Sequence, residues 1–184
     1  MVTFPDLHEP LSDRVVTLRL FADRDIPDVL VAYEHDPELH ERLGEIRPPS
    51  GAELGRYAEE ADARRAAGRG LTLTILESGA DVCRGEIRVH EVDLAHARCE
   101  LGIWVAPRLR GQGLGPRALR LAAGWLLDTC GLERLAILTE VDNAPMRAAA
   151  ERAGFRSEGI LRGYTFEHGR RIDHAVLSRV AGDP

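Results

Sequence analysis

The stretch RLRGQGLGPRAL, residues 108–119, carries three glycines at alternate positions, Gly111, Gly113 and Gly115. Glycine permits positive φ and a close approach of the backbone to a ligand. Successive backbone N–H groups ahead of a helix form a site for anions, which the helix dipole strengthens. The spacing therefore has two interpretations, a flexible turn between two elements or a cradle for a phosphate group.

The common nucleotide-binding loops do not fit this stretch. A P-loop ends in G-K-[ST], whereas Pro116 and Arg117 follow the last glycine here. A dinucleotide fingerprint has the spacing G-x-G-x-x-G, whereas this loop reads G-x-G-x-G and comes late in the chain. The pattern that remains is R-x-x-G-x-G starting at Arg110, which favours a pyrophosphate loop of another kind.

Two strands and two helices must position the loop. RCELGIWVA (98–106) predicts a strand, LGPRALRLAAGWLLDTC (114–130) a helix with one apolar stripe, and RLAILTEV (134–141) a buried strand. A strand, a helical crossover and a second strand imply a parallel pair. DNAPMRAAAERAG (142–154) then predicts a helix with Asn143 at its start.

The rest of the chain predicts antiparallel strands and short helices. Residues 25–36 predict a helix with Asp25 as N-cap, residues 37–43 a less regular one, and residues 50–68 a helix opened by an S-x-x-E capping box. The expected strands are residues 14–21, the hairpin 71–78 and 81–93, and the closing strands 155–166 and 170–180. The chain is therefore expected to be one α/β (α+β) domain, residues 1–184, with a mixed sheet and helices on both faces.

Composition limits the class of protein. The chain has 184 residues, 44% of them hydrophobic and 29% charged, with a formal net charge of −6. That charge argues against nucleic acid as the main partner and is compatible with a cationic substrate. The three cysteines are scattered and suit a reducing compartment, and no spacing typical of metal ligands is found. The sequence also has no long apolar run and no signal peptide. We therefore expect a cytoplasmic protein with no metal and no membrane partner.

With these elements in order, the chain resembles the GCN5-related N-acetyltransferase (GNAT) superfamily, whose acetyl-coenzyme A motif is Q/R-x-x-G-x-G/A between a strand and a long helix. ELGIWVAPRLRGQGLGPRAL resembles that unit in the subgroup that acetylates ribosomal-protein N-termini, the RimJ/RimL type. Three further segments resemble the same subgroup: NAPMRAAAERAGFRSEGILR, HGRRIDHAVLSRV and RVVTLRLFADRDIPDVL.

The resemblance implies both a fold and an activity. The implied fold is a mostly antiparallel sheet of about seven strands with a splayed parallel pair. The implied activity is direct transfer, in a ternary complex, of an acetyl group from acetyl-CoA to a primary amine. The acceptor would be an amine-bearing small molecule or a protein N-terminus, and the enzyme a monomer or a homodimer.

The resemblance also assigns contacts with the co-substrate. The loop would bind the pyrophosphate, and the backbone of Trp104 and Val105 would pair with the pantetheine arm as an added strand does. Their side chains are equally consistent with core packing. Asn143 matches an asparagine that bonds the pantetheine, and it is also a preferred N-cap residue. The implied coenzyme A contacts are Trp104, Val105, Arg110, Gly111, Gln112, Gly113, Leu114, Gly115 and Asn143.

Attack by the amine requires a base, because an aliphatic amine is protonated at neutral pH. Glu100 is the first candidate, since it lies two residues before Gly102 on the strand that feeds the loop, where the subgroup often carries an acid. The alternative is a strand glutamate paired with an arginine such as Arg98. Weaker candidates on or near the preceding turn are His90, Glu91 and His96.

Two positions depart from the family's pattern. Many members carry a tyrosine as general acid seven residues after the asparagine, where this chain has Ala150, and the subgroup often has a serine three residues after it, where this chain has Met146. Either Asn143 and water suffice, or Tyr164 of a later strand supplies the proton, unless Tyr164 only lines the acceptor groove. These departures leave two alternatives open, another acyl donor such as succinyl-CoA and a non-catalytic acyl-CoA-binding sensor.

An acidic stretch, residues 33–45, follows the first helix, where the family walls the acceptor site. Its carboxylates would favour a cationic amine, although most of them are better explained by a solvated helix face. They are Glu34, Asp36, Glu38, Glu41 and Glu45.

Overall fold

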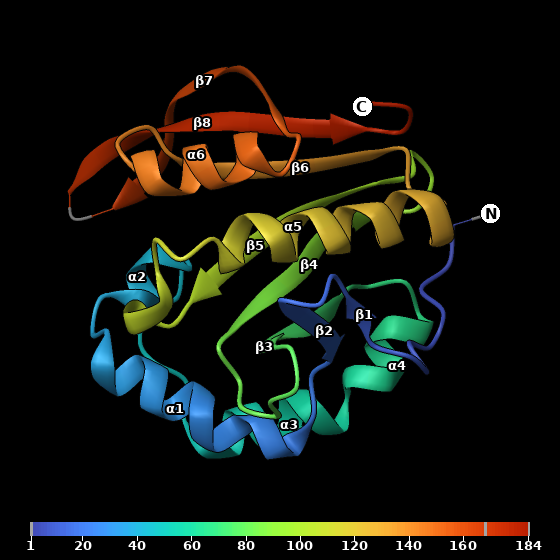
Figure 1. Cartoon of the computed structure of the whole chain (residues 1–184). Helices are drawn as coiled ribbons and strands as arrows, with labels where there is room; N and C mark the ends of the chain where they lie inside the picture. The colour runs from blue at the N-terminus through green and yellow to red at the C-terminus, as the bar shows by residue number, and fades with distance from the viewer. Residues whose placement is uncertain (1, 168, 184) are drawn as a thin grey trace.

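Within the residues that the computed structural model describes, 2–167 and 169–183, eight strands form one sheet in the order β1-β2-β3-β4-β5-β6-β8-β7 (Figure 1). Alternating apolar residues define most of these strands. Their bounds are β1 Leu11–Ser12, β2 Val16–Leu20, β3 Leu71–Glu77, β4 Gly85–Asp93, β5 Arg98–Val105, β6 Arg134–Glu140, β7 Arg156–Glu167 and β8 Arg170–Val180.

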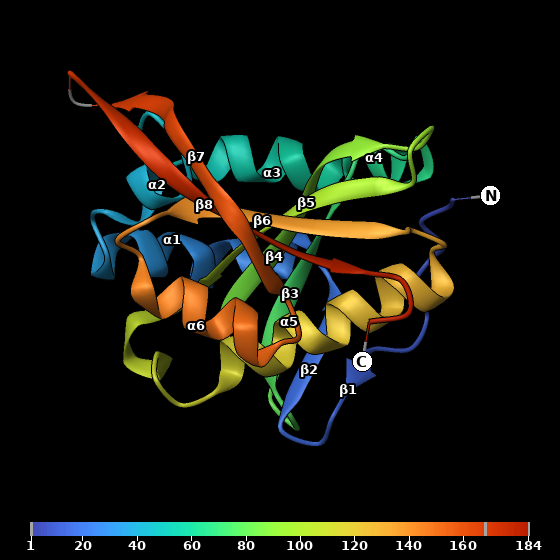
Figure 2. The same cartoon turned by 90° about the horizontal axis from the view of Figure 1, so that it is seen from above.

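The pairing between β5 and β6 is parallel, and all other neighbouring strands pair antiparallel. The parallel register covers Arg98–Arg134, Cys99–Leu135 and Glu100–Ala136, after which the two strands diverge (Figure 2). The predicted mixed sheet with a splayed parallel pair is confirmed. The expected number of strands was one too low, because the two-residue β1 is too short to show any periodicity.

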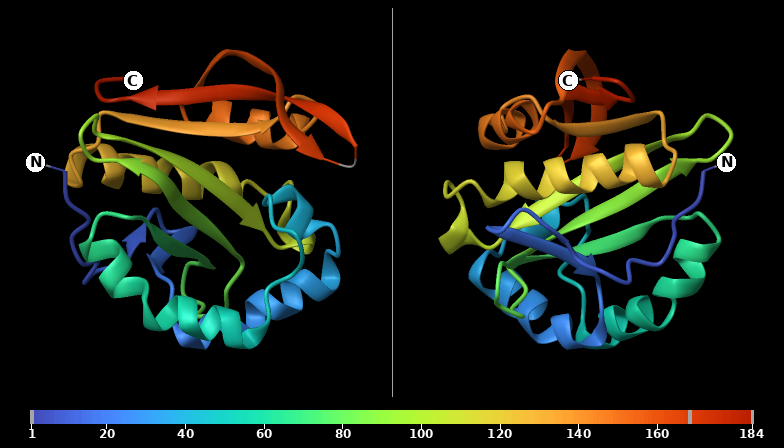
Figure 3. Two further views of the ribbon diagram at one scale, coloured as in Figure 1. Left: turned by 180° about the vertical axis from the view of Figure 1, so that it is seen from behind. Right: turned by 45° about the vertical axis from the view of Figure 1, so that its right-hand side comes forward.

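Two groups of helices cover the two faces of the sheet (Figures 2 and 3). Helices α1 Ile26–His35, α2 Leu39–Arg42, α3 Gly51–Glu59 and α4 Ala61–Ala66 lie on one side. Helices α5 Leu114–Gly124 and α6 Ala144–Arg152 lie on the other, and α5 continues as a single π turn, Trp125–Thr129. None of the helices in the described ranges combines the length and apolarity that a membrane crossing requires.

Each face of the sheet has its own core. The larger core lies under α5, whose Ala118, Leu119 and Ala122 are fully buried against the strands. The smaller core joins α1, α2 and α3 to the end of β5 through residues such as Tyr33 and Trp104.

All three cysteines are buried and unpaired, and burial raises the pKa of Cys99 and of Cys130 to about 12.

Of the two N-caps that the sequence predicted, for α3 and for α1, the structure shows one. The capping box of α3 is confirmed, because the Ser50 N–H donates to Glu53 Oε2 at 2.8 Å and the Glu53 N–H donates to Ser50 Oγ at 3.3 Å. Asp25 does stand at the N-cap position of α1, but its side chain makes no cap there. Instead its buried carboxylate accepts two hydrogen bonds of 2.7 Å from Arg19, since a buried charge requires a partner of opposite sign.

Candidate active site

The glycine loop connects the end of β5 to the start of α5. A 3₁₀ turn, Pro107–Leu109, follows β5, and α5 begins after Gly113. Gly111 and Gly113 have φ values of +76° and +85°, which L residues with a side chain rarely adopt, so two of the three glycines are required by the backbone itself. Gly115 lies in the first turn of α5 with ordinary helical geometry.

The glycine loop has five consecutive backbone N–H groups without a partner. Those of residues 111–115 donate a hydrogen bond to no acceptor among the residues that the structure describes. No side chain caps the start of α5 either. Free N–H groups at a helix N-terminus carry a partial positive charge, so this arrangement favours a bound anion.

Arginines around the loop add positive charge, but they already have protein partners. Arg110 Nε donates to the carbonyl oxygen of Val105 at 2.9 Å, and its Nη2 donates to Asp36. Arg117 Nη1 lies 2.8 Å from Asp13 Oδ2. Gln112 is also occupied, because its Nε2 donates to the carbonyl oxygen of residue 108 at 2.8 Å. The backbone, not these side chains, therefore offers the unpaired donors.

A cleft of about 790 Å³ lies over the paired starts of β5 and β6, next to the point after which the two strands diverge. The turn between β4 and β5, the starts of β5 and β6, and parts of β7 and β8 line it. Glu100 and Tyr164 both line this cleft, so the structure brings together two of the three predicted catalytic residues. Leu94, Leu138, Leu161 and Val176 supply much of its apolar wall.

Glu100 is only partly buried in this cleft, and within the described residues it makes no ion pair or hydrogen bond. The alternative that Arg98 pairs with Glu100 is wrong, because Arg98 Nη2 lies 3.2 Å from Asp93 Oδ2. The other lining arginine, Arg134, lies 2.5 Å from Glu158. Glu100 therefore keeps a carboxylate that is free to interact with a ligand.

The weaker candidates for the base surround Glu100. His90 on β4 stands directly opposite Glu100 in the antiparallel register. Glu91 lies in a bulge of β4 with φ of +46° and lines the cleft, whereas His96 is exposed and bonded to Asp93 at 2.9 Å. Glu91 is therefore accessible from the cleft, whereas the His96 side chain is already bonded to Asp93.

Asn143 acts as the N-cap of α6. Its Oδ1 accepts a hydrogen bond of 3.2 Å from the Met146 N–H. Of the two roles that the sequence allowed, an N-cap and a pantetheine contact, the structure shows the N-cap. Its amide nitrogen makes no hydrogen bond with the described residues. Ala150 is fully buried and Met146 packs against the core, so neither position of the family's usual acids offers a proton.

Tyr164 is half-exposed on β7. Its side chain has 51% exposure, and its ring lies 5.2 Å from that of His174. The phenol therefore remains accessible from the cleft that it lines.

The Trp104 side chain belongs to the core and to a buried polar network that the sequence did not reveal. Its Nε1 donates to Glu86 Oε2 at 2.9 Å, and Arg88 lies 3.2 Å from the same oxygen. Burial raises the pKa of Glu86, although Arg88 opposes this. Arg88 also bonds Glu45 at 2.5 Å. The only hint of this network in the sequence was the spacing of Glu86 and Arg88, two charged residues at alternate positions of one strand, which place both side chains on the same face.

The acidic stretch is mostly neutralised by arginines. Asp36 bonds Arg42 and Arg110, and Glu38 bonds Arg42 at 3.1 Å. Glu45 bonds Arg88 and accepts a hydrogen bond of 2.8 Å from the hydroxyl of Tyr33. These side chains therefore stabilise the α1–α2 region and do not present free charge to a cationic amine.

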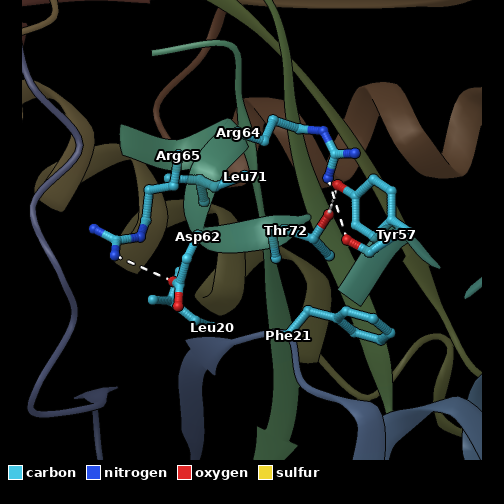
Figure 4. A pocket seen from close by; sticks show the side chains of 9 residues that line it. Leu20, Phe21, Tyr57, Asp62, Arg64, Arg65, Leu71 and Thr72 are labelled. Atoms are coloured by element: carbon cyan, nitrogen blue, oxygen red, sulfur yellow. Dashed lines mark hydrogen bonds and ion pairs between the residues drawn. The ribbon is translucent and has the colours of Figure 1, made fainter. Parts of the chain in front are cut away.

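A second, much smaller cavity of about 20 Å³ lies between α3, α4 and strands β2 and β3 (Figure 4). Its polar side chains bond one another, as in the 2.7 Å contact of the Tyr57 and Thr72 hydroxyls and the 3.2 Å ion pair of Arg65 with Asp62. Arg64 stacks 4.1 Å from the centre of the Tyr57 ring. The cavity has room for one water molecule, not for a substrate.

Comparisons with known proteins agree with this geometry. The family model described as "Acetyltransferase (GNAT) domain" matches residues 16–156. "Putative ribosomal N-acetyltransferase YdaF" of Bacillus subtilis is 29% identical over 166 residues, which cover 89% of this chain and 90% of that protein. "Spermidine N(1)-acetyltransferase" of Escherichia coli is 28% identical over 92 residues, which cover 48% of this chain and 50% of that protein.

A solved structure has the same fold over its whole length. The ribosomal L7/L12 alpha-N-protein acetyltransferase RimL, in complex with coenzyme A, superposes with a TM-score of 0.83 over 96% of this chain and 100% of its own. At 16% identity this likeness speaks for the fold alone. Because the family model spans strands β2 to β6, the glycine loop and α6, the chain belongs to the GNAT acetyltransferase family and is an N-acetyltransferase.

Proposed function

We propose that the chain binds acetyl-CoA with its pyrophosphate at the head of α5 and acetylates, by direct attack in a ternary complex, an amine held in the neighbouring cleft. The observation that carries the proposal is the run of five backbone N–H groups, residues 111–115, that bind no acceptor in the described part of the chain. The proposal takes residues 1–184 as one domain that works in the cytoplasm, as a monomer or a homodimer.

The residues at the head of α5 fit an anionic pyrophosphate. A Cβ built on Gly111 or Gly113 meets no atom within 4 Å, so the space above these residues is open. Charge-assisted hydrogen bonds from backbone N–H groups suit phosphate oxygens, and arginines nearby add favourable potential. The residues proposed to hold the pyrophosphate through their backbone N–H groups are Gly111, Gln112, Gly113, Leu114 and Gly115, with Arg110 beside them.

The separated part of β5 fits the pantetheine arm. Beyond Glu100, β5 has no paired neighbour on its β6 side, so backbone groups of Trp104 and Val105 have an open strand edge beside them. An extended arm can pair there as an added strand. Asn143 stands at the head of α6 after β6, with an amide nitrogen free to donate. Bound in this way, acetyl-CoA supplies an activated thioester.

Glu100 is proposed as the base. Its carboxylate, directly or through one water, takes a proton from the ammonium group of the acceptor, so that the nitrogen lone pair is free to attack. A backbone N–H of the separated β5 edge donates to the oxygen on which negative charge develops. When the C–S bond of the resulting tetrahedral intermediate breaks, the leaving thiolate takes a proton from Tyr164 or, with Asn143, from water, and the second proton of the new amide nitrogen passes to water. The thiolate needs only modest help, because thiols have a pKa of about 8.5.

A polypeptide N-terminus is the acceptor that these groups suit best. An α-amino group has a pKa of about 7.7–8.0, whereas an alkyl amine such as that of lysine has about 10.4, so one carboxylate can deprotonate the former more readily. The names of YdaF and RimL point to the same class of acceptor. The spermidine enzyme matches only half of this chain and makes a polyamine the second candidate.

The first test measures thiol release from acetyl-CoA with a panel of amines, namely short peptides with free N-termini, spermidine and an aminoglycoside. Release above the rate without enzyme is expected with the peptides. Coenzyme A binding without release across the whole panel would instead favour an acyl-CoA-binding sensor, in line with Ala150 and Met146.

The second test replaces the proposed base. Glu100→Gln should lower kcat about 10²–10⁴-fold, the usual contribution of a general base, and leave the acetyl-CoA Kd nearly intact. Glu91→Gln, in the same cleft, is the matched control and should keep most of the turnover. If Glu100→Gln turns over like the parent from pH 6 to 9, Glu100 is not the base.

A further inference from the structure

A single carboxylate ties the glycine loop to the helices of the other face. Asp36 lies between α1 and α2, and its side chain is only 10% exposed. Its Oδ2 accepts hydrogen bonds from Arg110 of the loop and from Arg42 of α2. Because Arg110 also donates to the Val105 carbonyl, four segments meet at this one ion cluster, with α2 beside the end of β5 (Figures 1 and 3).

This cluster changes what Arg110 can do. Its Nη2 is directed at Asp36 and its Nε at the backbone of β5, and the Asp36 charge offsets its own. Burial raises the pKa of Asp36, but the hydrogen bonds from Arg42 and Arg110 lower it more, so the carboxylate is charged at neutral pH. Arg42 is fixed in turn by Glu38 at 3.1 Å. The guanidinium of Arg110 is therefore a structural bridge.

We propose that Asp36 is a positioning residue for acetyl-CoA: through Arg110 it holds the loop in the conformation that keeps the N–H groups of residues 111–115 free. Asp36 itself touches no substrate. The inference rests on the proposed function, because it requires the pyrophosphate to bind at this loop. It also means that α2 and the segment between α1 and α2 contribute to donor affinity, although they lie outside the donor motif.

The experiment compares two donors, acetyl-CoA and S-acetylpantetheine, of which the second lacks the pyrophosphate. Asp36→Asn should raise KM for acetyl-CoA about five- to tenfold, as expected for one coupled contact, and leave kcat and the KM for S-acetylpantetheine unchanged. Asp36→Glu, which keeps the charge, should restore most of the affinity. Arg110→Gln should raise the same KM, and adding Asp36→Asn to it should have little further effect.

The matched control is Asp81→Asn, because Asp81 also pairs with an arginine, Arg19, but contacts no part of the loop. It should behave like the parent with both donors. Asp36→Ser replaces Asp36→Asn if circular dichroism shows that the latter does not fold.

Three outcomes separate the possibilities. An unchanged KM for acetyl-CoA in Asp36→Asn would mean that Asp36 does not position the loop, and a lower KM would mean that Arg110 works better when released; either result would overturn the inference. An equal rise with both donors would mean general damage and would overturn it too. A parent enzyme that uses both donors equally would instead contradict the pyrophosphate cradle of the proposed function.

Discussion

The N-termini of α5 and α6 make an instructive pair. Each follows a strand of the parallel pair, and both lie at the same edge of the sheet (Figure 1). At α6, the Asn143 side chain accepts the Met146 N–H, so the helix caps itself. At α5, a glycine with φ of +85° occupies the cap position and no side chain caps the helix.

The difference separates structural capping from ligand binding. Capping by Asn stabilises a helix by about 1 kcal/mol, and α5 forgoes that stabilisation although it anchors the larger core. The anionic ligand proposed above would complete the open N-terminus of α5, whereas the closed N-terminus of α6 offers a ligand only the Asn143 amide nitrogen. Substitutions at the two cap positions should therefore have different consequences.

The largest effect is expected at the open N-terminus. Gly113→Val places a β-branched side chain at positive φ and over the N–H groups of the loop. Acetyl-CoA should bind roughly 100-fold more weakly, which equals the loss of one or two charge-assisted hydrogen bonds of about 1.5–3 kcal/mol each. Isothermal titration calorimetry with coenzyme A measures this.

Its control lies in the turn between β3 and β4. Gly79 has the same φ of +85° and the same open surroundings, so Gly79→Val carries a similar strain without touching the loop. Equal affinities in a folded Gly113→Val variant and in the Gly79→Val control would remove the distinction between the two helix starts.

A moderate effect is expected at the closed N-terminus. Asn143→Ala should lower the free energy of unfolding by about 1 kcal/mol, whereas Asn143→Asp retains a cap and should keep the stability. Both variants lose the amide donor, so both should raise the KM for acetyl-CoA. Urea unfolding and initial rates report the two properties separately. An Asn143→Asp variant with parental KM would show that Asn143 is a cap and nothing more.

The smallest effect concerns the ion pair beside the open N-terminus. Burial raises the pKa of Asp13, but hydrogen bonds from the backbone of Val15 and Val16 and from Arg117 lower it below 3.8 overall. A depressed carboxyl pKa adds stability above the unfolded pKa, and this is lost as pH falls through the folded pKa. The stability difference between the parent and Asp13→Asn should thus be constant from pH 7 to about 5 and shrink below about 4, as acid unfolding curves can show. A difference that persists at pH 2 would contradict the ion pair.

The sequence was informative where the backbone itself imposes a residue type. Gly111 and Gly113 occupy positive φ, and Glu100 lies on β5, the strand that leads into the glycine loop. The cleft that unites Glu100 with Tyr164 was expected only through family resemblance, because it depends on where β7 falls in the sheet. The single domain and the roles of the individual site residues stay predictions.

The choice of ionic partners could not be predicted. All 24 basic residues apart from histidine are arginines, so each carboxylate has many chemically equal partners in the sequence. Only the tertiary arrangement joins Asp25 to Arg19, Asp36 to Arg110 and Glu86 to Arg88. Local propensity likewise could not show that the Asp25 side chain would form an ion pair instead of capping α1, because the burial of the carboxylate decides between the two roles.

The short parallel register of β5 and β6 also has a consequence for how the molecule opens. In the described structure, the parallel ladder that joins strands β1–β5 to strands β6, β8 and β7 has only three register pairs. Backbone amides along this seam should exchange with deuterium faster than those in the centre of either half, since sub-global opening begins where few cross-strand bonds hold. If the donor binds across the seam as proposed, it should slow that exchange and so clamp two cooperative units together.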